Sequence, residues 1–273
     1  QGMWRHPSTQ NNLERLRGRG VHIFGPTEGS QACGDSGPGR MTEPQDIVEL
    51  TADLFETGAL AGRKVVITAG PTREAIDPVR YISNHSSGKM GYALAEAAAE
   101  AGADTVLISG PVNLPPPDRV KTIHVTSALE MHEAALAEAE NCQLFIASAA
   151  VADYRPARVA EQKMKKTADQ MTIELVKNPD IVSAVAALRN RPFTVGFAAE
   201  TSQVEDFARS KLERKKLDLV IANDVSDRTI GFNSDDNAVL VVEMQGAEAI
   251  PKINKSILAR QLIAKIADML PTD

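Results

Sequence analysis

Serine, glycine and lysine side chains gather in the segment Asn84–Gly91 (NHSSGKMG). An alanine-rich stretch with helical spacing follows it, so the backbone amides and hydroxyl groups of this segment would lie at the amino end of a helix. Unpaired amides at such an end carry partial positive charge and bind anions such as phosphate. We therefore treat Ser86, Ser87 and Gly88 as candidate anion-binding residues. The structural alternative is a capped helix that follows a long turn.

Two familiar phosphate-binding motifs do not fit this segment. Met90 stands where a P-loop needs Ser or Thr, and no glycine precedes Gly88 at the required distance. The dinucleotide fingerprint G-x-G-x-x-G is absent, and the next apolar run ends in Ser109-Gly110 without the acid that would hold an NAD ribose. The missing glycine fingerprint and the missing ribose-binding acid both count against an NAD(P)-dependent oxidoreductase.

Three lysines lie in a polar segment, Tyr154–Met171, that has no helical or strand period. Connections of this length in compact domains are usually lids or disordered. Lys163, Lys165 and Lys166 would then be a clamp for phosphates beside the anion site. The alternative is an ordinary solvated surface.

Further candidate residues lie within the expected strands and helices or directly after them. Asp153 follows the apolar run Leu144–Val151, where it would contact a ligand or cap a turn. Phe197 is flanked by small residues and would pack in the core or stack on a base. Lys211 and Lys215 are four apart, so they share one helix face and could hold a polyphosphate between them.

Elements that would position these residues alternate between strand and helix from Lys64 onward. Expected strands are Lys64–Gly70, Asp104–Gly110, Thr122–Thr126, Leu144–Val151, Phe193–Ala199, Leu217–Ala222 and Ala238–Glu243. Expected helices are Gly88–Gly102, Ala128–Glu138, Val204–Lys216 and Lys255–Leu270, with a further helix starting at Asn178 as N-cap and Pro179 as first helical residue.

This alternation predicts a Rossmann-like, doubly wound α/β fold: a mostly parallel sheet with helices on both faces. Ligands of such sheets bind at the carboxyl ends of the strands, where the candidate residues fall. Before the α/β domain, residues 1–57 are expected to form an irregular appendage rich in Gly, Pro and Ser, with one amphipathic helix at Glu43–Phe55.

Charge and composition exclude several classes of protein. A net charge of −6 argues against general binding to nucleic acid or an acidic membrane. Two cysteines far apart form no disulfide framework and favour the cytoplasm. No apolar run approaches the ~20 residues that span a membrane. The five histidines lack metal-ligand spacing, so no protein metal site is predicted.

Several segments together resemble one family, the bacterial bifunctional phosphopantothenoylcysteine decarboxylase/synthetases. The resemblance to the synthetase half runs from about Lys64 to the carboxyl terminus. The matching segments are Ala69–Asp77, Arg80–Gly91, Ser148–Tyr154, Lys163–Lys166, Lys177–Val182, Val195–Thr201, Ala222–Ser226 and Gly231–Asn237.

The resemblance implies a phosphopantothenate–cysteine ligase of coenzyme A biosynthesis. Its partners would be CTP, Mg²⁺ carried on the CTP triphosphate, 4′-phosphopantothenate and L-cysteine, and the chain would form a homodimer with shared active sites. Residues implied to contact CTP are Ala147, Ser148, Ala149, Asp153, Lys163, Pro179, Asp180, Ile181, Val182, Phe197, Lys211 and Lys215, with further donors from Ser86, Ser87 and Gly88. Asn84 and Lys163 are the implied catalytic residues, and Arg80 with Asn84 would bind 4′-phosphopantothenate.

Residues 1–57 resemble the end of the decarboxylase half. Ala32–Met41 (ACGDSGPGRM) looks like its substrate clamp, in which Cys33 takes the place of the proton donor. The flavin-binding region of that half has no counterpart in the sequence. We therefore expect a truncated remnant and linker over residues 1–57, a synthetase domain over residues 58–273, no decarboxylase activity and no bound FMN. A non-catalytic regulatory subunit is the remaining alternative, against which the lid lysines and Asn84 argue.

Overall fold

The structure is a computed structural model that describes residues 2–30, 34, 36–54, 58–165, 169–200, 203–224 and 234–271. The chain divides into two compact units, Gln1–Glu56 and Thr57–Asp273. Within the described ranges, no helix combines the length and apolar character needed to cross a membrane.

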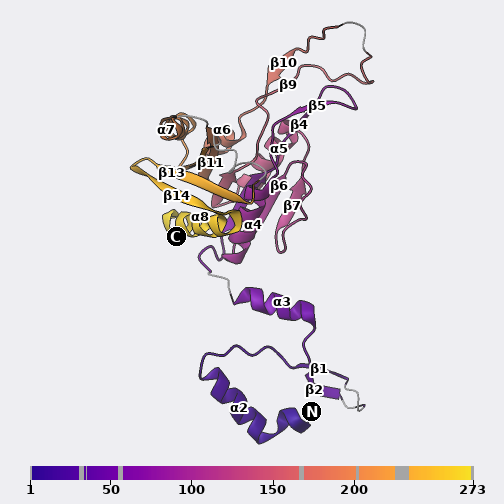
Figure 1. The fold of residues 1–273 in the computed structure, drawn as a ribbon, viewed down its shortest axis with the longest axis vertical. Coiled ribbons are helices and arrows are strands. Elements are labelled where there is room, and N and C mark those ends of the chain that lie inside the picture. Colours follow the sequence, from indigo (N-terminus) through magenta and orange to yellow (C-terminus); the bar gives the residue numbers. More distant parts are fainter. Residues whose placement is uncertain are drawn as a thin grey trace. The chain divides into compact units, whose positions relative to one another are not determined.

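The first unit contains short helices and one small sheet (Figure 1). Its elements are α1 (Gly2–Arg5), α2 (Pro7–Arg17), β1 (Thr27–Ser30), β2 (Ser36–Arg40) and α3 (Pro44–Asp53). The predicted helix over Glu43–Phe55 is confirmed as α3. Helix α2 was not predicted, although Pro7 at its first position and the His6 side chain, which accepts from the Ser8 amide, are start signals.

The second unit is built on one eight-stranded sheet. Its strands are β3 (Lys64–Ala69), β6 (Asp104–Ser109), β7 (Lys121–His124), β8 (Leu144–Ala147), β11 (Phe193–Glu200), β12 (Leu219–Asp224), β13 (Asp236–Glu243) and β14 (Gly246–Asn254). The spatial order is β14-β13-β12-β11-β8-β3-β6-β7. The six strands from β7 to β12 are parallel, while β13 and β14 run antiparallel at one edge. The predicted Rossmann-like fold is confirmed, and the order of the parallel strands reverses between β3 and β8, which is where ligands bind such sheets.

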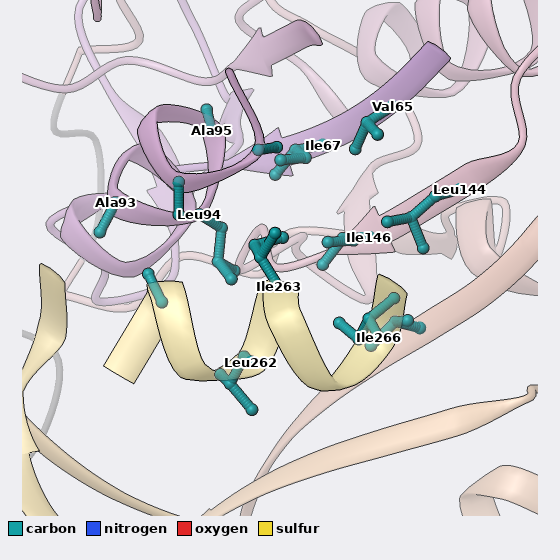
Figure 2. Packing of buried hydrophobic residues seen from close by; sticks show 14 of the residues in the cluster. Val65, Ile67, Ala93, Leu94, Ala95, Leu144, Ile146, Leu262, Ile263 and Ile266 are labelled. Carbon is teal, nitrogen blue, oxygen red and sulfur yellow. The ribbon is translucent and has the colours of Figure 1, made fainter. Parts of the chain in front are cut away.

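Helices cover both faces of the sheet. Helices α4 (Lys89–Glu100) and α8 (Lys255–Met269) pack on one face, and α5 (Ala128–Ala139), α6 (Ile181–Ala186) and α7 (Val204–Lys215) pack on the other. Side chains alternate accordingly along β3, where Ile67 joins the cluster of α4 and α8 while Val66 joins that of α5. Figure 2 shows Ile263 of α8 directed at the strands that carry Ile67 and Ile146.

Two small ribbons project from the carboxyl ends of the strands and were not predicted. Strands β4 (Arg73–Ala75) and β5 (Tyr81–Ser83) form one antiparallel pair, and β9 (Tyr154–Pro156) and β10 (Leu175–Lys177) form the other. The second pair forms the base of the expected lid, so the polar segment Tyr154–Met171 starts as a strand (Figure 1). Strands of three residues carry too little periodicity to be read from sequence.

Phe145 is the largest fully buried side chain in the sheet, at 0% exposure in the centre of β8. Its truncation to alanine should lower the free energy of unfolding by about 3–5 kcal/mol, because apolar burial is lost and a cavity remains. Urea denaturation measures this loss. The matched control is Leu129→Ala at a leucine of α5 that is 41% exposed, where a loss below about 1 kcal/mol is expected. Equal losses in both variants would contradict the assignment of Phe145 to the core.

Candidate active site

The segment between β5 and α4 turns sharply to bring its hydroxyls to the helix end. Gly88 is the N-cap of α4 and has a φ of +77°, and a side chain there would meet the Val112 Cγ1 atom at 2.8 Å. The Ser86 hydroxyl accepts a hydrogen bond from the Gly88 amide at 3.3 Å, and the Ser87 hydroxyl accepts one from Lys89 at 3.5 Å. Hydroxyls and the positive end of a twelve-residue helix thus meet in one place, which suits an anion.

Small residues after β8 bring the backbone to the surface of the cleft. The Ser148 amide donates to the Thr68 carbonyl at 3.2 Å, and the Ala149 amide donates to the Thr68 hydroxyl at 3.3 Å. The Ala150 amide donates to the Gly70 carbonyl at 2.9 Å. These bonds fix the run against β3, and the small side chains of Ser148, Ala149 and Ala150 leave room for a flat ligand beside the main chain.

Both candidate lysines of α7 reach the same wall of the cleft. The Lys211 ammonium donates to the Phe197 carbonyl, and the Lys215 ammonium lies 2.9 Å from the Asp180 carboxylate. Burial raises the pKa of Asp180, but hydrogen bonds from Lys215 and the Ser183 amide outweigh it and leave the pKa lowered. Asp180 is therefore ionised, and Lys215 is partly neutralised by it.

The start of α6 differs from the prediction. Asp180, rather than Asn178, is the N-cap, and its carboxylate accepts from the Ser183 amide at 3.1 Å. Asn178 is 6% exposed and instead holds the base of the lid, because its side-chain Nδ2 atom donates to the Ala152 carbonyl at 2.8 Å and its Oδ1 atom accepts from the Arg155 guanidinium at 3.0 Å.

Two adjoining cavities join these segments into one cleft. The larger measures about 510 Å³ and the smaller about 190 Å³. They share Ala149, Val151, Asp153, Phe197 and Lys211 in their walls. Of the predicted residues, the larger cavity contains Asn84, Ser86, Ser87, Gly88, Ser148, Ala149, Asp153, Phe197 and Lys211, and the smaller adds Ala147, Pro179, Asp180, Ile181, Val182 and Lys215.

Three predicted residues lie elsewhere or outside the described part. Arg80 lines neither cavity, and its guanidinium is paired with Asp77 at 2.6 Å. Lys163 is exposed in the lid and lines neither cavity. Cys33 lies outside the described residues.

The cleft also contains polar residues that sequence reasoning missed. Lys89, Asn223, Asn237 and Lys255 line the larger cavity. The Asn237 side-chain Nδ2 atom donates to the Asn223 side-chain Oδ1 atom at 3.2 Å. Burial, reinforced by the positive charge of Lys89, lowers the pKa of Lys255. Asn223 directly follows the predicted strand Leu217–Ala222, and ligands bind such sheets at the carboxyl ends of the strands, so the sequence could have indicated Asn223 as a site residue.

Among the described residues of this cleft, metal-ligating side chains do not gather. In the described part of the chain, no group of three or more His, Cys, Asp or Glu residues comes together. Asp153 is the acidic residue in the described wall of the larger cavity. A Mg²⁺ ion there would take most of its oxygen ligands from phosphates and water, as Mg²⁺ commonly does.

Fold and cleft together define a class of protein: a Rossmann-like α/β protein whose ligand cleft lies where the strand order reverses, lined by amides, hydroxyls and lysines. Residues 60–270 match the family described as the DNA/pantothenate metabolism flavoprotein C-terminal domain, and residues 1–56 match the family described as flavoprotein. The chain belongs to the family of coenzyme A biosynthesis bifunctional proteins.

Relatives within this family align over nearly the whole chain. The bifunctional protein CoaBC of Vibrio vulnificus is 56% identical over 99% of this chain and 68% of its own length. That of Escherichia coli K12 is 54% identical over 97% of this chain and 67% of its own. A crystal structure of the C-terminal domain of a CoaBC protein superposes with a TM-score of 0.67 at 40% identity, covering 78% of this chain and 97% of that one.

These matches overturn part of the sequence interpretation. Residues 1–56 match a flavoprotein family in their own right, and the alignment with bifunctional relatives runs through both parts of the chain. The interpretation as a synthetase half with a decarboxylase remnant was therefore wrong, as were the expectations of no decarboxylase activity, no FMN and a missing decarboxylase domain. The error arose because the missing flavin-binding motifs were given more weight than the match of residues 1–56 to the flavoprotein family.

Proposed function

We propose that residues 58–273 form a phosphopantothenate–cysteine ligase domain that uses CTP. The observation that carries the proposal is the convergence of Asn84, Ser86–Gly88, Phe197 and Lys211 from three separate segments, the β5–α4 connection, β11 and α7, on one cavity of about 510 Å³. Amides, hydroxyls and an ammonium suit a polyphosphate, while Phe197 and the small residues after β8 suit a pyrimidine base.

The first step joins a carboxylate to a nucleotide. A carboxylate oxygen of 4′-phosphopantothenate attacks the α-phosphorus of CTP, the bond from that phosphorus to the bridging oxygen breaks, and pyrophosphate leaves. Two anions must meet, so preorganised positive charge is the main source of rate. Lys163 supplies it from the lid, Lys211 and Lys215 from α7, and Ser86–Gly88 from the start of α4. Mg²⁺ bound to the triphosphate would neutralise further charge.

The second step forms the amide. The cysteine amine attacks the acyl carbon of the acyl-cytidylate, the bond from that carbon to the phosphate oxygen breaks, CMP leaves, and the amine proton passes to solvent. Asn84 donates to the acyl carbonyl as negative charge develops on it. The Asn84 amide already donates to the Val151 carbonyl at 3.0 Å, so its orientation is set before the ligand arrives.

Product analysis tests this function. Incubation with CTP, 4′-phosphopantothenate and L-cysteine should give 4′-phosphopantothenoylcysteine and CMP by mass spectrometry, with ATP a poorer substrate. An oxidoreductase would instead be stabilised thermally by NAD(P). Absence of the amide product from folded protein would support a non-catalytic subunit. The cytoplasm, which supplies all three substrates, is the proposed location.

We also propose that the active protein is a homodimer with shared sites. Arg80 lines neither cavity of its own subunit, which supports a role toward the site of a partner. If so, Arg80→Ala and Asn84→Asp should each be inactive alone, and a mixture of the two should regain activity, up to about a quarter of the wild-type rate, because half of the random dimers hold one site of two with both Arg80 and Asn84 present. The regained rate falls below this limit to the extent that Arg80→Ala also frees the lid of its own subunit, since Arg80 Nη2 donates to the Met164 carbonyl. Dissociation and reassociation of the subunits precedes the assay. Failure of the mixture to regain activity, although dimers form by sedimentation, would indicate that each site takes Arg80 and Asn84 from the same subunit.

A further inference from the structure

A buried carboxylate shapes the turn between β4 and β5. Asp77 is 2% exposed, and its Oδ1 atom accepts from the amides of Val79 at 2.9 Å and Arg80 at 2.8 Å. Its Oδ2 atom accepts from the Arg80 guanidinium at 3.0 Å from Nε and 2.6 Å from Nη2. The Oδ1 atom thus stabilises the turn, while the Oδ2 atom binds the guanidinium of Arg80.

The same carboxylate also holds the lid. The Met164 amide donates to Asp77 Oδ2 at 3.2 Å, and Arg80 Nη2 donates to the Met164 carbonyl at 3.2 Å. Met164 directly follows Lys163. Four residues earlier, the Ala160 amide donates to the Ile76 carbonyl at 3.0 Å. Lys163 therefore lies between two tethers to a single turn.

The β4–β5 pair connects the lid to Asn84 as well. Strand β5 leads directly into Asn84, and the Ser83 hydroxyl donates to the Thr72 carbonyl at 2.7 Å. Asn84 is bonded in turn to Val151, three residues before β9. A single ribbon thus sets the relative position of the two residues assigned to the two chemical steps.

Electrostatics keep this anchor charged. The hydrogen bond from Arg80 holds the pKa of Asp77 well below its usual range, against the opposing effect of burial, and the amides of Val79, Arg80 and Met164 lower the pKa further. A carboxyl with a depressed pKa keeps its folded-state interactions above its ordinary pKa and loses them only in acid. At neutral pH the anchor is complete.

We propose that Asp77 is a positioning residue for the ligase reaction: through the Met164 peptide and the Arg80 guanidinium it fixes the lid segment that carries Lys163 against the β4–β5 turn, and so sets where the lid can deliver Lys163. The proposal rests on the proposed role of Lys163 in the first step. Asp77 itself lines neither cavity, so it acts through the lid and not on the substrate. Misplacement of a reacting group by about 1 Å can cost on the order of 100-fold in rate, so such an anchor has a measurable effect.

Asp77→Asn is a sharp test because it keeps the Oδ1 acceptor of the turn and replaces Oδ2 by a donor. We expect kcat for pyrophosphate release from CTP and 4′-phosphopantothenate to fall by on the order of 10- to 100-fold, with a smaller change in KM for CTP. The double variant Asp77→Asn/Lys163→Gln should be no slower than Lys163→Gln alone, because the anchor has nothing left to position. A matched control is Glu100→Gln, which breaks the exposed pair with Arg260 (2.6 and 2.7 Å) and should keep the wild-type rate.

Each result separates this proposal from the proposed function. The positioning role alone is overturned if Lys163→Gln slows pyrophosphate release while Asp77→Asn keeps the wild-type rate. It is also overturned if the losses of the two single variants multiply in the double variant. Wild-type rates in Lys163→Gln overturn the role of Lys163 and the anchor with it. If Asp77→Asn does not fold, Met164→Pro is the alternative test. Proline has no backbone N–H, so this variant removes the hydrogen bond from the Met164 amide to Asp77 and leaves the turn at Asp77 unchanged. The anchor predicts the same loss for Met164→Pro, and a wild-type rate would overturn it.

Discussion

Asn84→Asp is expected to separate the two half-reactions. Pyrophosphate should still be released once per active site, because the first step depends on the phosphate-binding groups. The cysteine-dependent second step should slow by about 100- to 1,000-fold, the usual cost of removing one donor to a developing oxyanion. Aspartate cannot donate to the acyl carbonyl, and it places negative charge beside the Val151 carbonyl that now accepts from Asn84 at 3.0 Å. Rapid-quench assays with labelled CTP measure both steps.

Asn190→Asp provides a matched control for that experiment. Asn190 is exposed just before β11, at the amino end of a strand and so at the opposite edge of the sheet from the cleft. The same chemical change there should leave both half-reactions unaltered. Equal slowing of pyrophosphate release and amide formation in Asn84→Asp would contradict the specific assignment of Asn84 to the second step.

Lys163→Gln is expected to impair the opposite half-reaction. Pyrophosphate release should slow by on the order of 100-fold, because the attack of a carboxylate on a triphosphate loses one positive charge from its transition state. Once formed, the acyl-cytidylate should react with cysteine at nearly the wild-type rate. Single-turnover release of pyrophosphate, followed by addition of cysteine, measures the two rates in one sample.

The lid offers its own control for Lys163. Lys165 is also exposed, two residues further along, and Lys165→Gln removes the same charge from the same segment. A clamp specific to Lys163 predicts a far smaller effect for Lys165→Gln. Similar losses in both variants would mean that the lid contributes general positive charge, and unaltered pyrophosphate release in Lys163→Gln would remove the clamp from the mechanism.

Long periodic elements of the fold were predictable from sequence, and short ones were not. The apolar run of β8 and the alanine-rich α4 carry strong patterns, because strands buried on both faces and helices against a sheet require them. The strands β4, β5, β9 and β10 have three residues each and are held by a few hydrogen bonds and by the turn at Asp77. Such short strands show no hydrophobic periodicity in the sequence. Strand β14 lies at a solvent-exposed edge, where burial does not constrain composition.

The candidate site was predictable where it follows a strand or opens a helix. Asn84 and Ser86 lie just before the start of α4, Asp153 follows the apolar run of β8, and all three line the larger cavity. Lys255 was missed because it begins a helix that reaches the cleft from the far end of the chain, a relation set by tertiary packing. The pairing of Asp77 with Met164 joins residues 87 apart in sequence, and no local pattern reports it.

Pyrophosphate release from CTP and 4′-phosphopantothenate, with and without L-cysteine, tests the central claim most directly. The proposed mechanism predicts release of about one pyrophosphate per active site without cysteine, as expected when a covalent intermediate accumulates, and continuous release when cysteine is added. No release from the folded protein with either CTP or ATP would contradict it.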